Sequence, residues 1–242
     1  MVVLWWIASV TFLNGVRVPT PFGVLSSFAD DGWGFYSRQF GVTIEEATRG
    51  FVYGNVLALV LASLVLLVPV VESVITQVAV ISYCLPIVAL APVLYVVIGP
   101  PASGEPSGTA VALASISVFF TTVVGAVLGF RSADRTSLDV VSVYGGGRWQ
   151  QMRKVQLVSA FPAILSSLQI AAPAAFLGAI LGEYVGGVER GVGLALRTAQ
   201  QNVDVERAWG IGLACALVAG LAYAVFGLVS RFVTPWAKGA GS

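Results

Sequence analysis

Long uncharged stretches alternate with short charged segments along this chain. Residues 1–16, 50–71, 73–104, 106–130, 155–182 and 208–230 contain no Asp, Glu, Lys or Arg. A helix needs about 20 mainly apolar residues to cross about 30 Å of hydrocarbon. The pattern therefore predicts six transmembrane helices, at residues 2–16, 51–70, 75–98, 109–130, 164–182 and 208–230.

The first of these spans is short and has a second interpretation, the apolar core of a signal peptide. No basic residue precedes it, and no small-residue cleavage site follows it before Arg17. A signal peptide normally has both a basic residue before its apolar core and such a cleavage site after it. We therefore interpret residues 2–16 as a span.

The composition agrees with a membrane location. Of the 242 residues, 57% are hydrophobic and only 10% are charged, and the mean hydropathy is +0.88. Soluble domains carry about 25% charged residues, so a soluble globular fold is excluded. We expect an all-α membrane protein that forms a single transmembrane domain over residues 1–242.

Several kinds of chemistry lack the residues that they need. The chain has no histidine, and Cys84 and Cys215 both fall within predicted spans, where small buried thiols are common. Histidine-based catalysis, haem ligation, a disulfide framework and a zinc site are therefore not expected. The phosphate-binding motif G-x-x-x-x-G-K-[ST] is also missing. No metal site is expected either, and if ATP powers this protein, another chain must bind it.

The distribution of charge predicts an orientation. The loop over residues 131–163 carries five basic and two acidic residues, and cytoplasmic loops carry an excess of Lys and Arg. This loop and both termini are therefore expected in the cytoplasm, and residues 17–49, 99–107 and 183–207 outside. The inverted topology would reverse the charge bias. We expect turns and one interfacial helix in residues 17–49.

The loop at residues 131–163 has the most specific pattern in the chain. It predicts a short amphipathic helix, a glycine break at residues 145–147, and a second helix that ends before Pro162. Two helices joined by a glycine turn suit docking in a groove on a partner. A basic loop facing lipid headgroups would have a similar composition. The exposed side chains expected there are Tyr144, Arg148, Trp149 and Arg153.

This loop resembles the coupling loop of ABC transporter permeases, with its signature E-A-A-x-x-x-G followed by I-x-L-P. It is most similar to the nitrate, sulfonate and taurine branch. The matching residues are Gly145, Arg148, Trp149, Gln150, Arg153, Lys154, Val155, Leu157, Ala160 and Pro162. Asp139 replaces the usual Glu, Val140 and Val141 replace two alanines, and Val158 replaces the first proline.

Other motifs agree in order and spacing. Pro86-x-x-Ala89-x-x-Pro92 is similar to the family's P-x-x-A-x-x-P-L, and residues 183–196 resemble its E-F-x-G and G-L-G-x-x-I block. Pro19-Thr20-Pro21-x-x-Val24 is similar to its P-S-P-x-x-V. The resemblance therefore covers nearly the whole chain.

The resemblance implies the membrane-spanning subunit of a type I ABC importer in the bacterial cytoplasmic membrane. Such a subunit is not an enzyme and binds no cofactor itself, because ATP and Mg are bound by the partner ATPase. Its implied partners are ABC ATPase subunits, a second permease subunit and an external substrate-binding protein, in addition to the lipid bilayer, with no nucleic acid. A homodimer is slightly favoured over a heterodimer. The residues implied in ATPase coupling are Asp139, Tyr144, Gly145, Arg148, Trp149, Arg153 and Pro162.

Candidates for the translocation pathway are polar side chains and prolines within or beside the spans. Each has a structural alternative: the prolines bend a helix, and Glu183 anchors an external loop. A stripe of small residues (Ala110, Ala114, Ser117, Thr121 and Gly125) is more typical of a helix-packing face than of a pore wall. The pathway candidates are Ser82, Pro86, Pro92, Ser117, Thr121, Gln169 and Glu183.

Two other functions are compatible with the number of spans. An ATP-independent channel or secondary carrier usually shows charges in mid-membrane or broken helices in matched halves, and neither pattern is evident here. The scaffold component of a vitamin importer also contacts ATPases, but the motifs at residues 86–92 and 183–196 favour a permease. The sequence does not determine the substrate.

Overall fold

The computed structural model describes residues 5–6 and 18–235, and this part of the chain folds into helices without a strand. The predicted span at residues 2–16 lies outside the described residues, except for Trp5 and Trp6. The elements are α2 (Pro21–Leu67), η1 (Pro69–Val71), α3 (Glu72–Cys84), α4 (Ile87–Ile98), α5 (Gly108–Arg131), α6 (Arg135–Val143), α7 (Arg148–Gln151), η2 (Met152–Gln156), α8 (Leu157–Val185), α9 (Val192–Gln201) and α10 (Val205–Val233).

Helix α2 is much longer than the span predicted at residues 51–70. It starts at the cap residue Thr20, whose hydroxyl accepts a hydrogen bond from the Gly23 N–H at 3.1 Å. Gly32, with φ of 67°, kinks it into a short first helix and a long second one. The prediction of mainly turns over residues 17–49 is therefore wrong, although the short first helix agrees with the one helix expected there. Tyr36 and Phe40 are buried in the core, and this packing keeps the backbone helical beyond the bilayer-length segment.

The span predicted at residues 75–98 is not a single helix. Helices α3 and α4 meet at an angle of 97° at Leu85 and Pro86. Proline disfavours helical backbone at the residue before it, and Leu85 is extended, with φ of −69° and ψ of 125°. Pro86 is the cap residue directly before α4, whereas Pro92 lies inside α4. The segment is therefore a broken span or a re-entrant loop rather than a straight crossing.

The centre of the molecule is α5, packed between α2 and α8. A Cβ atom on Gly182 of α8 would lie 2.3 Å from Ala110 Cα, and one on Gly178 would lie 2.8 Å from Ala114 Cα. Gly50 of α2 approaches α5 equally closely, at Val111 and Ala114. Small residues let helix backbones approach closely in membranes. The prediction that the small-residue stripe on α5 is a packing face is confirmed.

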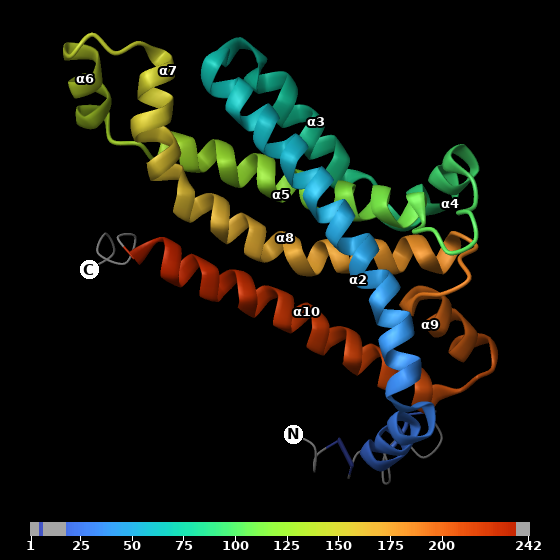
Figure 1. Cartoon of the computed structure of the whole chain (residues 1–242). Helices are drawn as coiled ribbons and strands as arrows, with labels where there is room; N and C mark the ends of the chain where they lie inside the picture. The colour runs from blue at the N-terminus through green and yellow to red at the C-terminus, as the bar shows by residue number, and fades with distance from the viewer. Residues whose placement is uncertain (1–4, 7–17, 236–242) are drawn as a thin grey trace.

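Helix α8 continues without interruption through Pro162, so the prediction of a helix end before this residue is wrong. Ala160 and Ala163, on either side of the proline, pack against Gly129 of α5. This contact holds the helix together where Pro162 supplies no N–H. The π turn η2 lies between α7 and α8, and the chain changes direction there (Figure 1).

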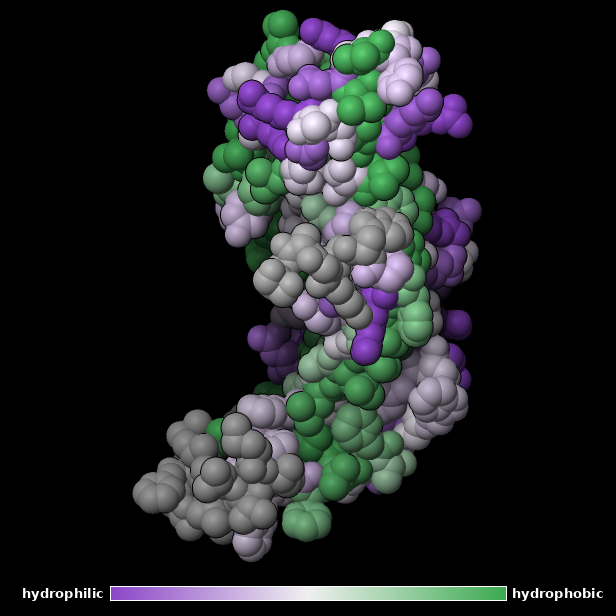
Figure 2. Space-filling model, turned by 90° about the vertical axis from the view of Figure 1, so that its left-hand side faces the viewer, coloured by the Kyte–Doolittle hydropathy of each residue, from purple (hydrophilic) through white to green (hydrophobic). Residues whose placement is uncertain are grey.

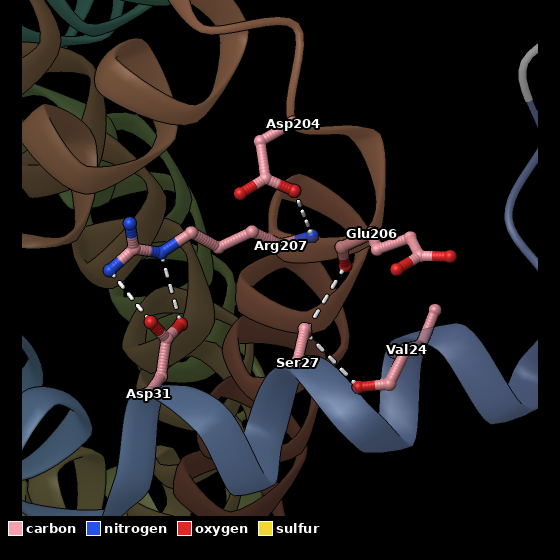
Figure 3. Close-up of polar contacts among 6 residues, drawn as sticks. All are labelled: Val24, Ser27, Asp31, Asp204, Glu206 and Arg207. Carbon is pink, nitrogen blue, oxygen red and sulfur yellow. Dashed lines mark hydrogen bonds and ion pairs between the residues drawn. The ribbon is translucent and has the colours of Figure 1, made fainter.

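Helix α10 is fixed at its beginning to the short first helix of α2 (Figure 3). Asp204 caps α10 by accepting the Arg207 N–H at 3.1 Å, and the Arg207 side chain forms an ion pair with Asp31 at 2.7 Å. The same guanidinium lies 4.4 Å from the centre of the Phe35 ring. Ser27 also donates to the Glu206 carbonyl at 3.4 Å. These contacts hold the kinked end of α2 against α10.

The connections gather at two ends of the molecule (Figure 1). One end carries the α2–α3 turn, α6 and α7, and the last turn of α10. The opposite end carries α9, the α4–α5 connection and the short first helix. Glu72 and Arg131 form an ion pair at the first end, and hydrophilic residues gather over the α6 and α7 region in Figure 2. This separation matches the alternation of loops that the sequence predicts.

Candidate functional site

The α6–α7 region, residues 134–156, is the candidate coupling site and is called the knob below. Asp134 caps the start of α6, and its carboxylate accepts hydrogen bonds from the Ser137 N–H at 3.0 Å and the Ser137 hydroxyl at 3.2 Å. The bond from the Ser137 N–H holds the pKa of Asp134 below its usual value. The charged form of Asp134 is therefore the one that caps α6.

The glycine turn of the knob is a Schellman motif. The Gly146 N–H donates to the Val141 carbonyl at 2.8 Å, and the Gly145 N–H donates to the Ser142 carbonyl at 2.9 Å. These are the two hydrogen bonds that close such a motif after a helix. Gly145 has φ of 76°, in the left-handed region. The glycine break predicted at residues 145–147 is therefore a defined turn. Its left-handed backbone at Gly145 favours glycine, which has no Cβ atom to clash with the backbone.

The side chain of Gln151 braces the two helices. Its Nε2 atom donates to the Leu138 carbonyl at 3.1 Å and to Ser142 Oγ at 2.7 Å. Both acceptors belong to α6, whereas Gln151 ends α7. The knob is therefore held together by both its turn and a side-chain bridge.

The outer surface of the knob combines apolar and basic side chains. Val143 is 84% exposed, Tyr144 is 87% exposed and Trp149 is 59% exposed. Large apolar side chains rimmed by polar residues are typical of protein interaction sites. The exposed charged residues around them are Asp139, Arg148, Arg153 and Lys154.

The inner side of the knob is joined directly to the membrane helices. Met152, the first residue of η2, is 6% exposed. From Arg148 to Val185 the chain forms one helical segment of 38 residues. The knob is therefore joined to α8 by continuous helical backbone rather than by a flexible linker.

The structure does not gather the pathway candidates into one site. Ser82 donates to its own helix at the Ala79 carbonyl, and Pro86 and Pro92 are exposed on the broken segment. Ser117 lies at the α5–α8 contact, beside Gly178, and Thr121 is half-buried on the same helix. Gln169 of α8 lies next to Gly227 of α10. Ser117 is thus a packing residue in this structure.

Glu183 is the exception, because it belongs to a buried polar cluster at the opposite end of α8. It accepts a hydrogen bond from the Thr43 hydroxyl at 2.6 Å and from the Gly193 N–H at 2.7 Å. Glu46, 1% exposed, accepts the Ser107 N–H at 2.5 Å in the same region. The sequence interpretation missed Thr43 and Glu46 because it assigned residues 17–49 to turns. Thr43 and Glu46 are three residues apart, so a helix through this segment would place both polar side chains on one face. This spacing could have indicated the cluster.

The match to known families covers most of the chain. Residues 54–238 match the family described as "Binding-protein-dependent transport system inner membrane component". The chain belongs to this family. It is therefore an all-α, multi-pass membrane permease of an ABC importer, in agreement with the fold class and the function expected from the sequence motifs.

Three relatives of the permease carry names of transport proteins. The riboflavin transport system permease protein RibX of Chloroflexus aurantiacus is 26% identical over 64% of this chain and 56% of its own length. The formylaminopyrimidine transport permease protein ThiX of Halalkalibacterium halodurans is 24% identical over 98% of this chain and 93% of its own length. A probable ABC transporter permease protein of Haemophilus influenzae is 27% identical over 68% of this chain and 65% of its own length.

Proposed function

We propose that the knob docks in a groove of a separate ATPase subunit and couples ATP binding to movement of the permease helices. The observation that carries this proposal is the exposed apolar surface of Val143, Tyr144 and Trp149 on a braced pair of helices. An apolar centre with a basic rim is the composition of a protein interface. A loop that only faces lipid headgroups does not need the rigid turn at Gly145.

The continuous helix from Arg148 to Val185 supports a mechanical role. Moving a two-state equilibrium from 1:99 to 99:1 requires about 5.5 kcal/mol of differential binding. A flexible linker between the docking surface and α8 would move without moving α8, so little of this binding free energy would act on the membrane helices. In this chain the Schellman turn, the Gln151 bridge and η2 connect the docking surface to α8 without a flexible linker. In this mechanism the permease performs no covalent chemistry, and ATP and Mg are bound by the ATPase partner.

The proposed topology places the knob and both termini in the cytoplasm, and α9 outside, in the bacterial cytoplasmic membrane. The excess of basic residues at the knob supports this orientation. An external binding protein would deliver substrate at the α9 end. Two copies of this 25.2 kDa chain with two ATPase subunits form the proposed complex. Native mass spectrometry that finds one copy beside a different membrane subunit would contradict the homodimer.

For the substrate, the names of the relatives support a planar nitrogen heterocycle. Two of them are named for riboflavin and formylaminopyrimidine, both of which contain such rings. The small oxyanions of the nitrate, sulfonate and taurine branch have different chemistry, and this branch stays a prediction from the loop motif. Uptake of labelled riboflavin, an aminopyrimidine and taurine by cells that express the complete transporter separates the two classes.

Crosslinking tests the docking surface. With Cys84→Ser and Cys215→Ala as background, Val143→Cys and Tyr144→Cys are expected to crosslink to the ATPase subunit in membranes. Ser142 and Gln151 are unsuitable positions because their side chains bridge the two helices of the knob. Ala102→Cys, in the α4–α5 connection at the opposite end, is the matched exposed control. Crosslinking of the ATPase to Ala102→Cys but to neither knob position would overturn the proposal.

A further inference from the structure

A pocket of about 220 Å³ lies at the α9 end of the molecule and is called the acidic pocket below. Its walls come from α2, the α4–α5 connection and the α8–α9 connection, which are far apart in the sequence but lie at the same end of the fold (Figure 1). The residues that line it are Val42, Glu45, Glu46, 101–106 and 188–190. Three separate segments therefore form one recess on the proposed outer face.

The acidic pocket has an excess of negative charge. The carboxylates among its lining residues are those of Glu45, Glu46, Glu105 and Glu189, and Arg190 is the basic residue among them. Glu45 forms an ion pair with Arg49 at 2.6 Å, and Glu189 accepts a hydrogen bond from the Ser103 hydroxyl at 3.2 Å. Among the described residues, no ion pair joins Arg190 to these carboxylates. The pocket therefore carries more negative charge than its own residues neutralise.

Glu46 brings an unpaired carboxylate oxygen to this pocket. The residue is 1% exposed, and its Oε1 atom accepts the Ser107 N–H at 2.5 Å. Its Oε2 atom is buried, and no donor contacts it among the described residues. A buried charged group without a partner is costly, so buried charges are normally paired. A positively charged group in the pocket would supply the missing partner.

The arrangement favours a cationic group on a long side chain over a bare metal ion. Among the described residues, no group of three or more Cys, Asp or Glu side chains could hold a metal ion. Glu105 and Glu189 are exposed, whereas Glu46 is buried, so the carboxylates lie at different depths. Lys and Arg carry several donors at the end of a flexible apolar stem. Such a side chain can enter from the mouth and reach the buried carboxylate.

We propose that the acidic pocket receives a lysine or arginine side chain of the external binding protein. The description of the family includes dependence on a binding protein, and such a permease needs an outer surface that recognises this partner. The outward orientation of the pocket rests on the proposed function. Complementary charges across an interface speed association and fix the orientation of the partner. The inserted cation neutralises Glu46 and so positions the binding protein over the α9 end.

Binding of the substrate-loaded binding protein to the permease–ATPase complex, in lipid nanodiscs without ATP, tests the pocket. The measured quantity is the Kd, obtained by biolayer interferometry. Glu46→Gln keeps an acceptor for the Ser107 N–H but removes a buried charge, and should raise the Kd about tenfold or more. Glu105→Gln and Glu189→Gln change exposed charges and should each raise it about two- to fivefold. Glu206→Gln, exposed on α10 at the same end but outside the pocket, is the matched control and should leave the Kd unchanged.

A double-mutant cycle identifies the side chain that enters the pocket. Each exposed Lys and Arg of the binding protein is replaced by Gln in turn, and the Kd is measured with the parent permease and with Glu46→Gln. One replacement should weaken binding to the parent about tenfold but have little effect on binding to Glu46→Gln, because the partner charge is already absent. Added salt should weaken binding to the parent more than binding to the double variant Glu105→Gln/Glu189→Gln.

An unchanged Kd in all pocket variants would overturn the proposal. Weaker binding without any Lys or Arg that couples to Glu46 would also overturn it, and would give the pocket a structural role. Altered substrate uptake at an unchanged Kd would assign the pocket to a substrate amine or an inorganic cation instead. The exposed variants Glu105→Gln and Glu189→Gln carry the test if Glu46→Gln does not fold.

The same measurement separates this proposal from the proposed function. A parent complex that does not bind the binding protein at all would contradict delivery at the α9 end together with the pocket. Normal binding by the parent and by every pocket variant would contradict the pocket alone. Because no ATP is used, the crosslinks between the knob and the ATPase report coupling independently of these Kd values.

Discussion

Gln151 Nε2 donates to Ser142 Oγ at 2.7 Å, across the turn at Gly145, and joins the two helices of the knob. The same nitrogen also donates to the Leu138 carbonyl. The two helices are too small to bury a hydrophobic core between them, and the hydrogen bonds of this one side chain hold them together. Neither α6 nor α7 is long enough to be stable alone. The shape of the knob therefore depends on a few specific polar contacts.

Replacement of Gln151 tests this dependence. Gln151→Ala removes both bonds and should cost about 1 kcal/mol in the local stability of the knob. We expect faster hydrogen exchange of the amides of residues 136–143 and reduced stimulation of the ATPase by substrate. Gln150→Ala is the control, because Gln150 lies on the same short helix but is not part of the bridge. Equal exchange in the two variants would contradict the role of Gln151.

The turn at Gly145 should not tolerate a β-branched residue. A strained backbone conformation costs about 1–3 kcal/mol, and Gly145 has φ of 76° although no atom lies within 4 Å of the Cβ position. Gly145→Val is therefore expected to abolish uptake while the subunit is still inserted and expressed. Gly147→Ala is the matched control, since Gly147 has φ of −80° and the same open surroundings. Normal uptake by Gly145→Val would remove the turn from the mechanism.

The contact between α5 and α8 should be sensitive to a single methyl group. In Gly182→Ala the new Cβ would lie 2.3 Å from Ala110 Cα and 2.7 Å from its backbone nitrogen. Overpacking of this kind costs about 1–3 kcal/mol, so the melting temperature in detergent should fall. Gly220→Ala in α10 has open space around it and should be neutral or stabilising by up to about 1 kcal/mol. The same melting temperature for both variants would exclude close packing as the cause.

The start of α6 should respond to acid. The pKa of Asp134 is lowered in the folded protein, so its capping contribution is fully present near neutral pH and is lost as the pH falls through that lowered pKa. Protection of the α6 amides from hydrogen exchange should therefore decrease below the usual range of an aspartate. Asp134→Asn caps without titrating and should keep its protection, whereas Asp134→Ala should lack it at every pH. An unchanged acid response in Asp134→Asn would assign it to another group.

The sequence predicted the parts of the fold that depend on local composition. Uncharged apolar stretches gave the positions of α5, α8 and α10, because a bilayer-length apolar segment has few other stable locations. Within the coupling loop, three adjacent glycines indicated the break after α6, since a left-handed residue is needed to end a helix in this way. The exposed Tyr144 and Trp149 follow from the same local pattern.

Features that depend on contacts between distant residues were decided by the tertiary structure. Pro162 and Pro86 are the same residue type, yet the helix continues through Pro162, where Ala160 and Ala163 pack against Gly129, and breaks at Pro86, which is exposed. Thr43 and Glu183 are far apart in the sequence and form a hydrogen bond only because α2 continues as a helix well outside the predicted span. Local sequence determines where helices are favourable. Packing determines which of them bend, how far they extend and which buried polar groups they bring together.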